Sequence, residues 1–277
     1  MLFRSNDYPN SQPYPLFQGI NGSLNNAVSN YNSLQVQATK RMSKGLEFSV
    51  NYTWSHFLDD LDSSGQNGLG GYQNYQDAYD PAANYSNANF DIRSMFKGHT
   101  IYQLPFGKGR QFLNNNWLLD ALAGGWQISS TWVIQGGEPM GITTGYNNTS
   151  FNQSGGYTQE ANLVGNYHLS GSTKSRLNEW YNLAAFAVPA PATYGDFRRN
   201  TVYGPGMNNW AMGLGKTFNL YPERDVKFQL RADAGNVFNH ASFGQPGNNA
   251  IGNGESAIIN SVSVGGRSIQ IYGHLTF

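Results

Sequence analysis

The acidic segment Asp60-Leu-Asp-Ser-Ser-Gly65 has the residue spacing that comes closest to a metal site. Its oxygen-bearing side chains at positions 1, 3 and 5 and its glycine at position 6 match the opening of an EF-hand calcium loop. Position 12 of such a loop requires a bidentate glutamate, and that position is Gly71 here. The pattern therefore favours a polar loop over a calcium site, and we expect no metal ligands.

The remaining chemistry-bearing residues form no catalytic pattern. The five histidines lack a ligand spacing such as i, i+4 on a helix, and they are His56, His99, His168, His240 and His274. No Gly-x-Ser-x-Gly elbow is present to support a serine hydrolase, and the chain contains no cysteine. We therefore expect no catalytic residues, no cofactor and no enzymatic activity.

Aromatic residues in the Gly- and Asn-rich segments are a third candidate group. Their rings could stack on sugars or other planar ligands, and the group comprises Tyr72, Tyr75, Tyr79, Tyr146 and Tyr157. The sequence leaves this role open beside that of an ordinary polar loop.

The composition indicates what kind of scaffold carries these residues. Charged residues make up 12% of the 277 positions and aromatic residues 14%, against roughly 25% charged residues in an ordinary soluble domain. Asn, Gln, Ser and Thr supply the polarity, and they hydrate a surface without bringing charge near hydrocarbon. The 17 basic and 17 acidic residues form no basic run, so nucleic acid is not an expected partner.

Alternation with a period of two predicts β-strands along most of the chain. In the segment 46–54, Leu46, Phe48 and Val50 share one face, and polar residues occupy the other. The tight turn at 42–45 joins this strand to the preceding one as a hairpin. Seven strands are predicted in total, at about 31–41, 46–56, 96–104, 125–135, 209–218, 226–236 and 266–277.

The links between these strands alternate in length. Short or moderate links at 42–45, 105–124 and 219–225 alternate with long links at 57–95, 136–208 and 237–265. Outer-membrane barrels have short periplasmic turns and long extracellular loops, whereas soluble domains rarely carry such long loops. The pattern predicts an all-β, antiparallel transmembrane β-barrel segment of about seven to eight strands, with Phe277 at the periplasmic rim.

An odd strand count indicates that this segment is part of a larger barrel. Single-chain bacterial barrels have an even number of strands, and lipid does not tolerate an unpaired sheet edge. The first residues also lack the basic and apolar regions of a secretory signal. We therefore expect a truncated chain, unless the segment 13–19 supplies an eighth strand and the sheet closes alone.

A soluble or surface-attached β-sandwich that binds carbohydrate through its aromatic loops is the alternative. Such a sandwich would also bury alternating aromatic residues. The uncharged polar faces and the unequal loops favour the barrel over this carbohydrate-binding module.

Several segments resemble one protein family in order and spacing. They are Pro13-Tyr-Pro-Leu-Phe-Gln-Gly-Ile20, Asn30-Tyr-Asn-Ser-Leu-Gln-Val36, Tyr52-Thr-Trp-Ser-His56 with Asp59-Asp60, Leu104-Pro-Phe-Gly-Lys-Gly109, Trp180-Tyr-Asn-Leu-Ala-Ala-Phe186, Arg199-Asn-Thr-Val-Tyr-Gly-Pro-Gly206, Asn236-Val-Phe-Asn-His240 and the terminal Phe277. Together they resemble the C-terminal barrel strands of TonB-dependent receptors of the Oar-like, carboxypeptidase-regulatory-domain type.

The resemblance implies a single C-terminal outer-membrane segment over residues 1–277. Residues 1–30 would be an extracellular loop or entry segment, and residues 31–277 the membrane strands and loops. The family implies energy-coupled uptake of a scarce ligand, with an N-terminal plug and further barrel strands as partners that this sequence does not contain. Phe277 resembles the terminal signal that the barrel-assembly machinery reads, and the bacterial outer membrane is the expected location.

The strand pattern also predicts which side chains face lipid. We expect lipid contact from Phe48, Val50, Tyr52, Ile128, Trp132, Phe228, Leu230, Ile269 and Ile271, and an inward orientation for Gln37, Asn51, Thr131, Gln229 and Gln270. Glu47, Lys227, Arg231 and Asp233 fall on the inward face, where pairing of charges across the wall is the favoured role.

Overall fold

Seven long strands form one antiparallel sheet in the computed structural model. The described residues are 26–62, 75–77, 80–107, 109–113, 117–145, 159–191, 193–224, 226–247, 249–252 and 256–277. The strands, in their order across the sheet, are β1 (Ser29–Ser43), β2 (Leu46–Asp59), β4 (Ser94–Gln103), β5 (Trp126–Gln135), β10 (Met207–Tyr221), β11 (Val226–Gly235) and β14 (Ser268–Thr276). This order confirms the predicted up-and-down strands, and the predicted strand ranges agree to within a few residues at most ends.

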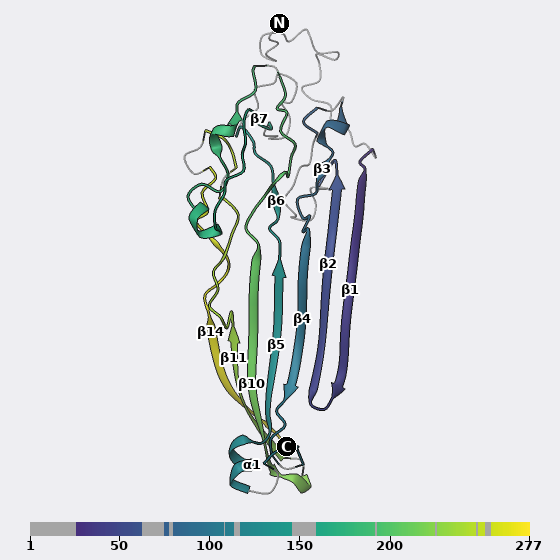
Figure 1. Cartoon of the computed structure of the whole chain (residues 1–277), viewed down its shortest axis with the longest axis vertical. Coiled ribbons are helices and arrows are strands. Elements are labelled where there is room, and N and C mark those ends of the chain that lie inside the picture. Colours follow the sequence, from purple (N-terminus) through teal and green to yellow (C-terminus); the bar gives the residue numbers. More distant parts are fainter. Residues whose placement is uncertain are drawn as a thin grey trace, which may run out of the picture.

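The two ends of the sheet differ, as the alternation of link lengths predicts. The long strands run along the long axis of the molecule, and the long connections gather at one end (Figure 1). The opposite end carries the C-terminus and the short connections, including α1 (Trp117–Ala123) and η5 (Pro222–Arg224). We call these the loop end and the turn end.

The turn between β1 and β2 follows from two residues with left-handed backbone. Lys44 has a φ of 52° and Gly45 a φ of 80°, and positive φ at both central positions defines the type I′ turn that matches the strand twist. A Cβ on Gly45 would lie 2.7 Å from the carbonyl oxygen of Gln103, so the neighbouring strand also restricts this position to glycine. The predicted hairpin is therefore confirmed.

Short elements fill the loop end. They are η2 (Pro81–Asn84), β3 (Ser86–Asn87), β6 (Pro139–Met140), β7 (Asn162–Leu163), η3 (Thr173–Arg176), η4 (Leu183–Ala185), β8 (Phe186–Ala187), β9 (Val202–Tyr203), β12 (Ser242–Phe243) and β13 (Val262–Val264). Strand β3 pairs with the outer end of β2, and the pairs β6–β9, β7–β8 and β12–β13 join segments of the long links.

The hydrophobic core of the described residues lies in these links and not in the sheet. Large side chains from distant parts of the links pack together, among them Trp180, Tyr181, Phe186 and Phe197. The rings of Phe186 and Phe197 meet edge to face at a centroid distance of 4.9 Å. We call the described residues of the links 60–93, 136–206 and 236–267 the loop cluster; its packing was not predicted from the sequence.

The sheet has two open edges among the described residues. Strand β1 pairs with β2 alone, and β14 pairs with β11 alone. The proposed eighth strand at 13–19 lies outside the described residues. No helix among the described residues is long and apolar enough to cross a membrane.

Candidate functional site

One face of the sheet is apolar across all seven strands. Residues that pair directly across antiparallel strands project from the same face. Val36 pairs with Tyr52, Tyr52 with Phe96, and Phe96 with Ile134. On the far side of the sheet Leu214 pairs with Ala232 and Ala232 with Ile271, while Phe228 pairs with Leu275. The register therefore gathers the predicted apolar residues on a single face, as the period of two required.

This apolar face carries large hydrophobic side chains that remain accessible. Val36 is 54% exposed, Leu275 50% and Ile271 69%. Soluble monomers rarely expose such a continuous apolar surface, and a sheet packed in a β-sandwich would cover it. Among the described residues no second large sheet packs on it. The face therefore has the properties of a lipid contact.

Aromatic rings mark both margins of the apolar face. Toward the loop end Phe96, Trp132, Trp210 and Phe238 form a continuous row, with a Trp132–Trp210 centroid distance of 5.2 Å. Toward the turn end Phe218 stacks on Phe228 at 6.2 Å. Phe218 follows Trp210 by eight positions, which corresponds to roughly 27 Å along a strand. Because barrel strands are tilted, the height that this length spans across the membrane is smaller. It approaches the ~25 Å apolar band of outer-membrane barrels.

The opposite face of the sheet is polar and hollowed. Gln37 pairs with Asn51 and Asn51 with Lys97, which places the three on this face as predicted. A hollow of about 710 Å³ lies over β1, β2 and β4. A second hollow of about 400 Å³ lies farther along the sheet, over β4, β5, β10 and β11.

The first hollow contains aromatic residues that the sequence interpretation did not single out. Tyr31 and Phe57 meet at a centroid distance of 5.7 Å, and Phe57 and Phe90 at 5.0 Å. Tyr31 and Phe90 are about half exposed, at 51% and 48%, so their rings are available to a ligand. Tyr31 and Phe57 have odd numbers, as do the polar residues of β1 and β2. The period of two could therefore have placed both rings on the polar face.

Of the four charged residues predicted on the polar face, Arg231 and Asp233 pair with each other along β11. The Arg231 Nε lies 2.8 Å from an Asp233 carboxylate oxygen, and the guanidinium also donates to the Ser129 hydroxyl at 3.0 Å. The Tyr272 hydroxyl donates to the same carboxylate at 2.8 Å. Glu47 lies 4.0 Å from a ring nitrogen of His99 on this face, where Lys227 also lies, paired in register with Thr276.

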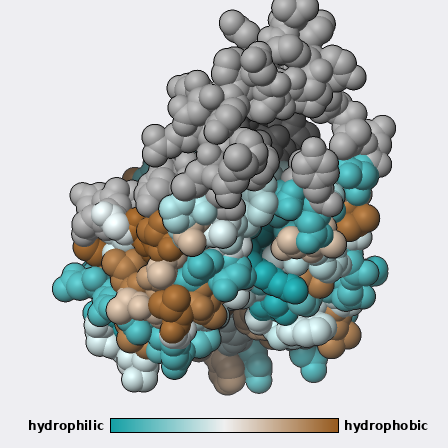
Figure 2. Space-filling view, turned by 90° about the horizontal axis from the view of Figure 1, so that it is seen from above, coloured by the Kyte–Doolittle hydropathy of each residue, from teal (hydrophilic) through white to brown (hydrophobic). Residues whose placement is uncertain are grey.

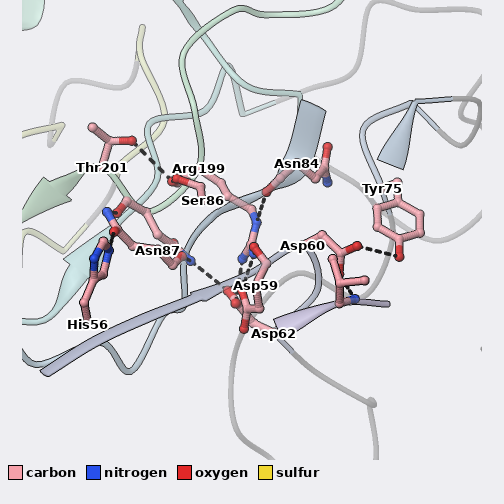
Figure 3. A network of polar contacts seen from close by, with 12 residues as sticks. His56, Asp59, Asp60, Asp62, Tyr75, Asn84, Ser86, Asn87, Arg199 and Thr201 are labelled. Carbon is pink, nitrogen blue, oxygen red and sulfur yellow. Dashed lines mark hydrogen bonds and ion pairs between the residues drawn. The ribbon is translucent and has the colours of Figure 1, made fainter. Parts of the chain in front are cut away.

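At the loop end a buried guanidinium fastens the loop cluster to the sheet (Figure 3). The Arg199 side chain is 1% exposed; it donates to the Asp59 carboxylate at the end of β2 and lies 2.6 Å from an oxygen of Asp62. Its Nε donates to the Asn84 carbonyl oxygen at 2.8 Å. Asn200, with a φ of 53°, directs its amide to Asp62 at 2.7 Å. The segment 199–200 thus contacts the end of β2 at Asp59, the following residue Asp62, and Asn84 of η2.

Burial and crowding of carboxylates shift the pKa of Asp59. Burial raises the pKa of Asp59 to about 7, and the neighbouring Asp62 carboxyl acts in the same direction, while Arg199 opposes it. Two carboxylates share one guanidinium, so a proton on one of them reduces their repulsion. The last residue of β2 is therefore titratable near neutral pH.

A second buried carboxylate, that of Asp91, also connects the loop cluster to β2. It accepts the backbone N–H of Phe57 at 2.8 Å and the Tyr203 hydroxyl at 2.7 Å, and it forms an ion pair with Arg93 at 2.7 Å. Burial raises the pKa of Tyr203 to about 12, and the hydrogen bond to Asp91 adds to this shift. Strand β9 is therefore held to β2 through the hydrogen bonds of Asp91 with Tyr203 and Phe57.

The structure describes residues 60–62 of the acidic segment 60–65. Asp62 faces Arg199 and Asn200, and Asp60 accepts the backbone N–H of Val28 at 3.0 Å. Ser64, Gly65 and Gly71 lie outside the described residues. In the described part of the chain no three His, Asp or Glu residues come together as a metal site. The described contacts of Asp62 are with Arg199 and Asn200.

The five histidines are divided between the sheet and the loop cluster. His99 and His274 lie on the polar face of the sheet, whereas His168 and His240 lie in the loop cluster. His56 lies near the end of β2, and its Nε2 is 3.0 Å from the Asn87 side-chain oxygen.

Of the five candidate tyrosines at 72, 75, 79, 146 and 157, Tyr75 belongs to the described residues. Its hydroxyl donates to Asp60 at 3.4 Å, so part of this side chain is engaged within the protein. Tyr72, Tyr79, Tyr146 and Tyr157 lie outside the described residues.

Viewed from the loop end, hydrophilic residues occupy the middle of the described surface and hydrophobic residues gather toward one side (Figure 2). The structure thus presents three surfaces: an apolar outer face, a polar inner face and a folded loop cluster.

One of three comparisons with known proteins found a match. A family model described as an outer membrane beta barrel domain matches residues 4–270. No curated protein and no solved structure matches the chain.

Proposed function

Because the chain belongs to the outer membrane beta barrel domain family and is located in the outer membrane, we propose that it forms part of the wall of a TonB-dependent receptor. In this proposal the receptor takes up a ligand that is too large or too rare for porins. A plug domain and further barrel strands are its partners.

The observation that carries the proposal is the combination of a lipid-facing sheet with a folded loop cluster over a polar inner face. Here the links 136–206 and 236–267 build their own hydrophobic core, and Arg199 locks them to β2. A rigid set of loops above a polar wall favours selective capture of a ligand.

The polar inner face supports the presence of a plug. The Arg231, Asp233, Tyr272 and Ser129 cluster forms a charged and hydrogen-bonding patch on β5, β11 and β14. Receptors that use a plug enclose it within the barrel lumen. A globular domain with complementary polar groups would pack against this patch.

The open edges of the sheet support the further strands. Unpaired backbone groups in lipid each cost several kcal/mol, so β1 and β14 require neighbours in a membrane. Such neighbours place these seven strands within a wider wall.

Depletion of compounds from the medium by living cells tests the function. Cells of the source organism would be supplied with a mixture of siderophores, oligosaccharides and peptides, and the compounds left in the medium would be measured. Deletion of this gene and deletion of TonB should each stop the uptake of the same compound. Uptake that requires this gene but persists without TonB or without proton-motive force would contradict the receptor proposal and indicate a passive channel.

A further inference from the structure

Lys216 is a charged residue on the apolar face of the sheet, and Lys40, which pairs with Phe48 close to the β1–β2 turn, is another. It lies on β10 between Leu214 and Phe218, pairs with Trp126 and Leu230, and is only 4% exposed. An unpartnered ammonium on a lipid-facing surface would be costly toward the bilayer centre and much less so near its margins. The surroundings of Lys216 therefore require an explanation.

The helix α1 provides the partners for this ammonium group. The Lys216 Nζ donates to the carbonyl oxygens of Ala121 and Leu122, at 2.5 Å and 3.0 Å. These carbonyls belong to the last turn of the helix, where they lack intrahelical partners and the helix dipole is negative. The ammonium also lies 5.4 Å from the centre of the Trp126 ring and 5.1 Å from that of Phe218.

These contacts fix α1 to the lipid-facing side of the wall. The Trp126 indole donates to the Leu122 carbonyl oxygen at 2.9 Å, which adds a second attachment to the apolar face. Gly125, with a φ of 72°, turns the chain directly from the helix into β5, and a Cβ there would lie 2.9 Å from the Thr217 carbonyl oxygen. The helix therefore cannot move far from the strand surface.

The composition and exposure of α1 suit a boundary between lipid and water. Its sequence Trp-Leu-Leu-Asp-Ala-Leu-Ala contains one charged residue, and Leu122 is 69% exposed. The aromatic margin formed by Trp126, Phe218 and Phe228 is continuous with the point of attachment. Aromatic rings and lysine at this level are typical of the headgroup region of a bilayer.

We propose that α1 is an interfacial helix that inserts into the headgroup layer of the leaflet at the turn end, on the outside of the wall. Lys216 holds the helix in place as a positioning residue, and phospholipid is the partner. This proposal concerns the membrane contact alone and does not depend on TonB-coupled uptake.

Site-directed spin labelling tests the proposal directly, because the native chain contains no cysteine. The full chain with Leu122→Cys would be labelled with a nitroxide in vesicles of phosphatidylethanolamine and phosphatidylglycerol. Labels at Ile271→Cys on the apolar face and Gln270→Cys on the polar face provide the lipid and water references. The label at 122 should collide more with lipid-dissolved oxygen than with a water-soluble nickel chelate. Collision with the chelate equal to that at position 270 would overturn the proposal.

The role of Lys216 is tested with the same label. Lys216→Met keeps an unbranched apolar stem but removes the donor, so the label at 122 should become several-fold more accessible to the nickel chelate. Lys97→Met, on the polar face, is the matched control and should leave the label at 122 unchanged. The label at Ile271 shows whether each variant is still inserted. An unchanged label at 122 in an inserted Lys216→Met variant would refute the positioning role.

Discussion

At the residue scale, adjacent positions on one strand have opposite environments. Val50 lies on the apolar face through its pairing with Ala38, and Asn51 lies on the polar face through its pairing with Gln37. We expect Val50→Arg to destabilise the inserted protein by about 2–4 kcal/mol, because it brings a charge into hydrocarbon. Asn51→Arg should be much milder. A reversible refolding titration into vesicles measures both, and equal costs would refute the assignment of the faces.

The pKa of Asp59 makes the attachment of the loop cluster dependent on pH. Its value is raised from 3.8 to about 7 in the folded protein, first by burial and then by Asp62. The folded state therefore binds the proton of Asp59 more tightly than the unfolded state does. The resulting contribution to the stability of the folded state is fully present below about pH 3.8 and is lost as the pH rises through about 7.

Amide exchange in the loop cluster tests this dependence. After correction for the intrinsic effect of pH on exchange, the residues around 84–91 and 199–203 should be better protected at pH 5 than at pH 8. Asp59→Asn, which cannot ionise, should flatten this difference while the Asp91 contacts of β9 remain. Protection that increases between pH 5 and pH 8 in the native chain, relative to Asp59→Asn, would contradict the assigned direction.

At the element scale, the strands could be predicted and the packing of the loops could not. The pattern of Leu46, Phe48 and Val50 is local, because each strand alternates between the same two environments along its whole length. The contact of Arg199 with Asp59 joins residues 140 positions apart, and no local period records it. The Lys216 contact with α1 was missed for the same reason, although a lone lysine in an apolar alternation was a usable signal.

Removal of Arg199 should loosen the loop cluster without disturbing the sheet. Arg199→Met leaves Asp59 and Asp62 buried without their cation, and loss of one partner of a buried pair costs roughly 3–5 kcal/mol. Limited proteolysis should then cut within 80–91 or 193–206 much faster, while β10 and β11 stay protected. Arg224→Met, at an exposed position in η5, is the control. Equal cleavage rates in the two variants would show that Arg199 does not hold the cluster.

At the scale of the whole molecule, the described sheet is open, because its end strands β1 and β14 do not pair with each other. All the large buried hydrophobic side chains of the described core belong to the loop cluster, so the sheet derives its stability from strand pairing and from lipid. A barrel wall has this property, because its outward side chains are buried by the bilayer and its strands by one another. The two edge strands, β1 and β14, are then the elements that require a further partner.

The exchange of backbone amides along β1 tests this requirement. In the described structure β2 contacts β1 on one side, whereas β5 has β4 and β10 as neighbours. In detergent micelles that hold a demonstrated monomer of this chain, half of the amides at 31–41 should exchange quickly, because the edge of β1 lacks a strand to accept them. Those of β5 should exchange slowly throughout, and they provide the internal control. At higher concentration a second copy should protect β1 and raise the measured mass of the complex. Slow exchange at every amide of 31–41 in the monomer would mean that the edge is already paired, and the sheet would then close without partner strands.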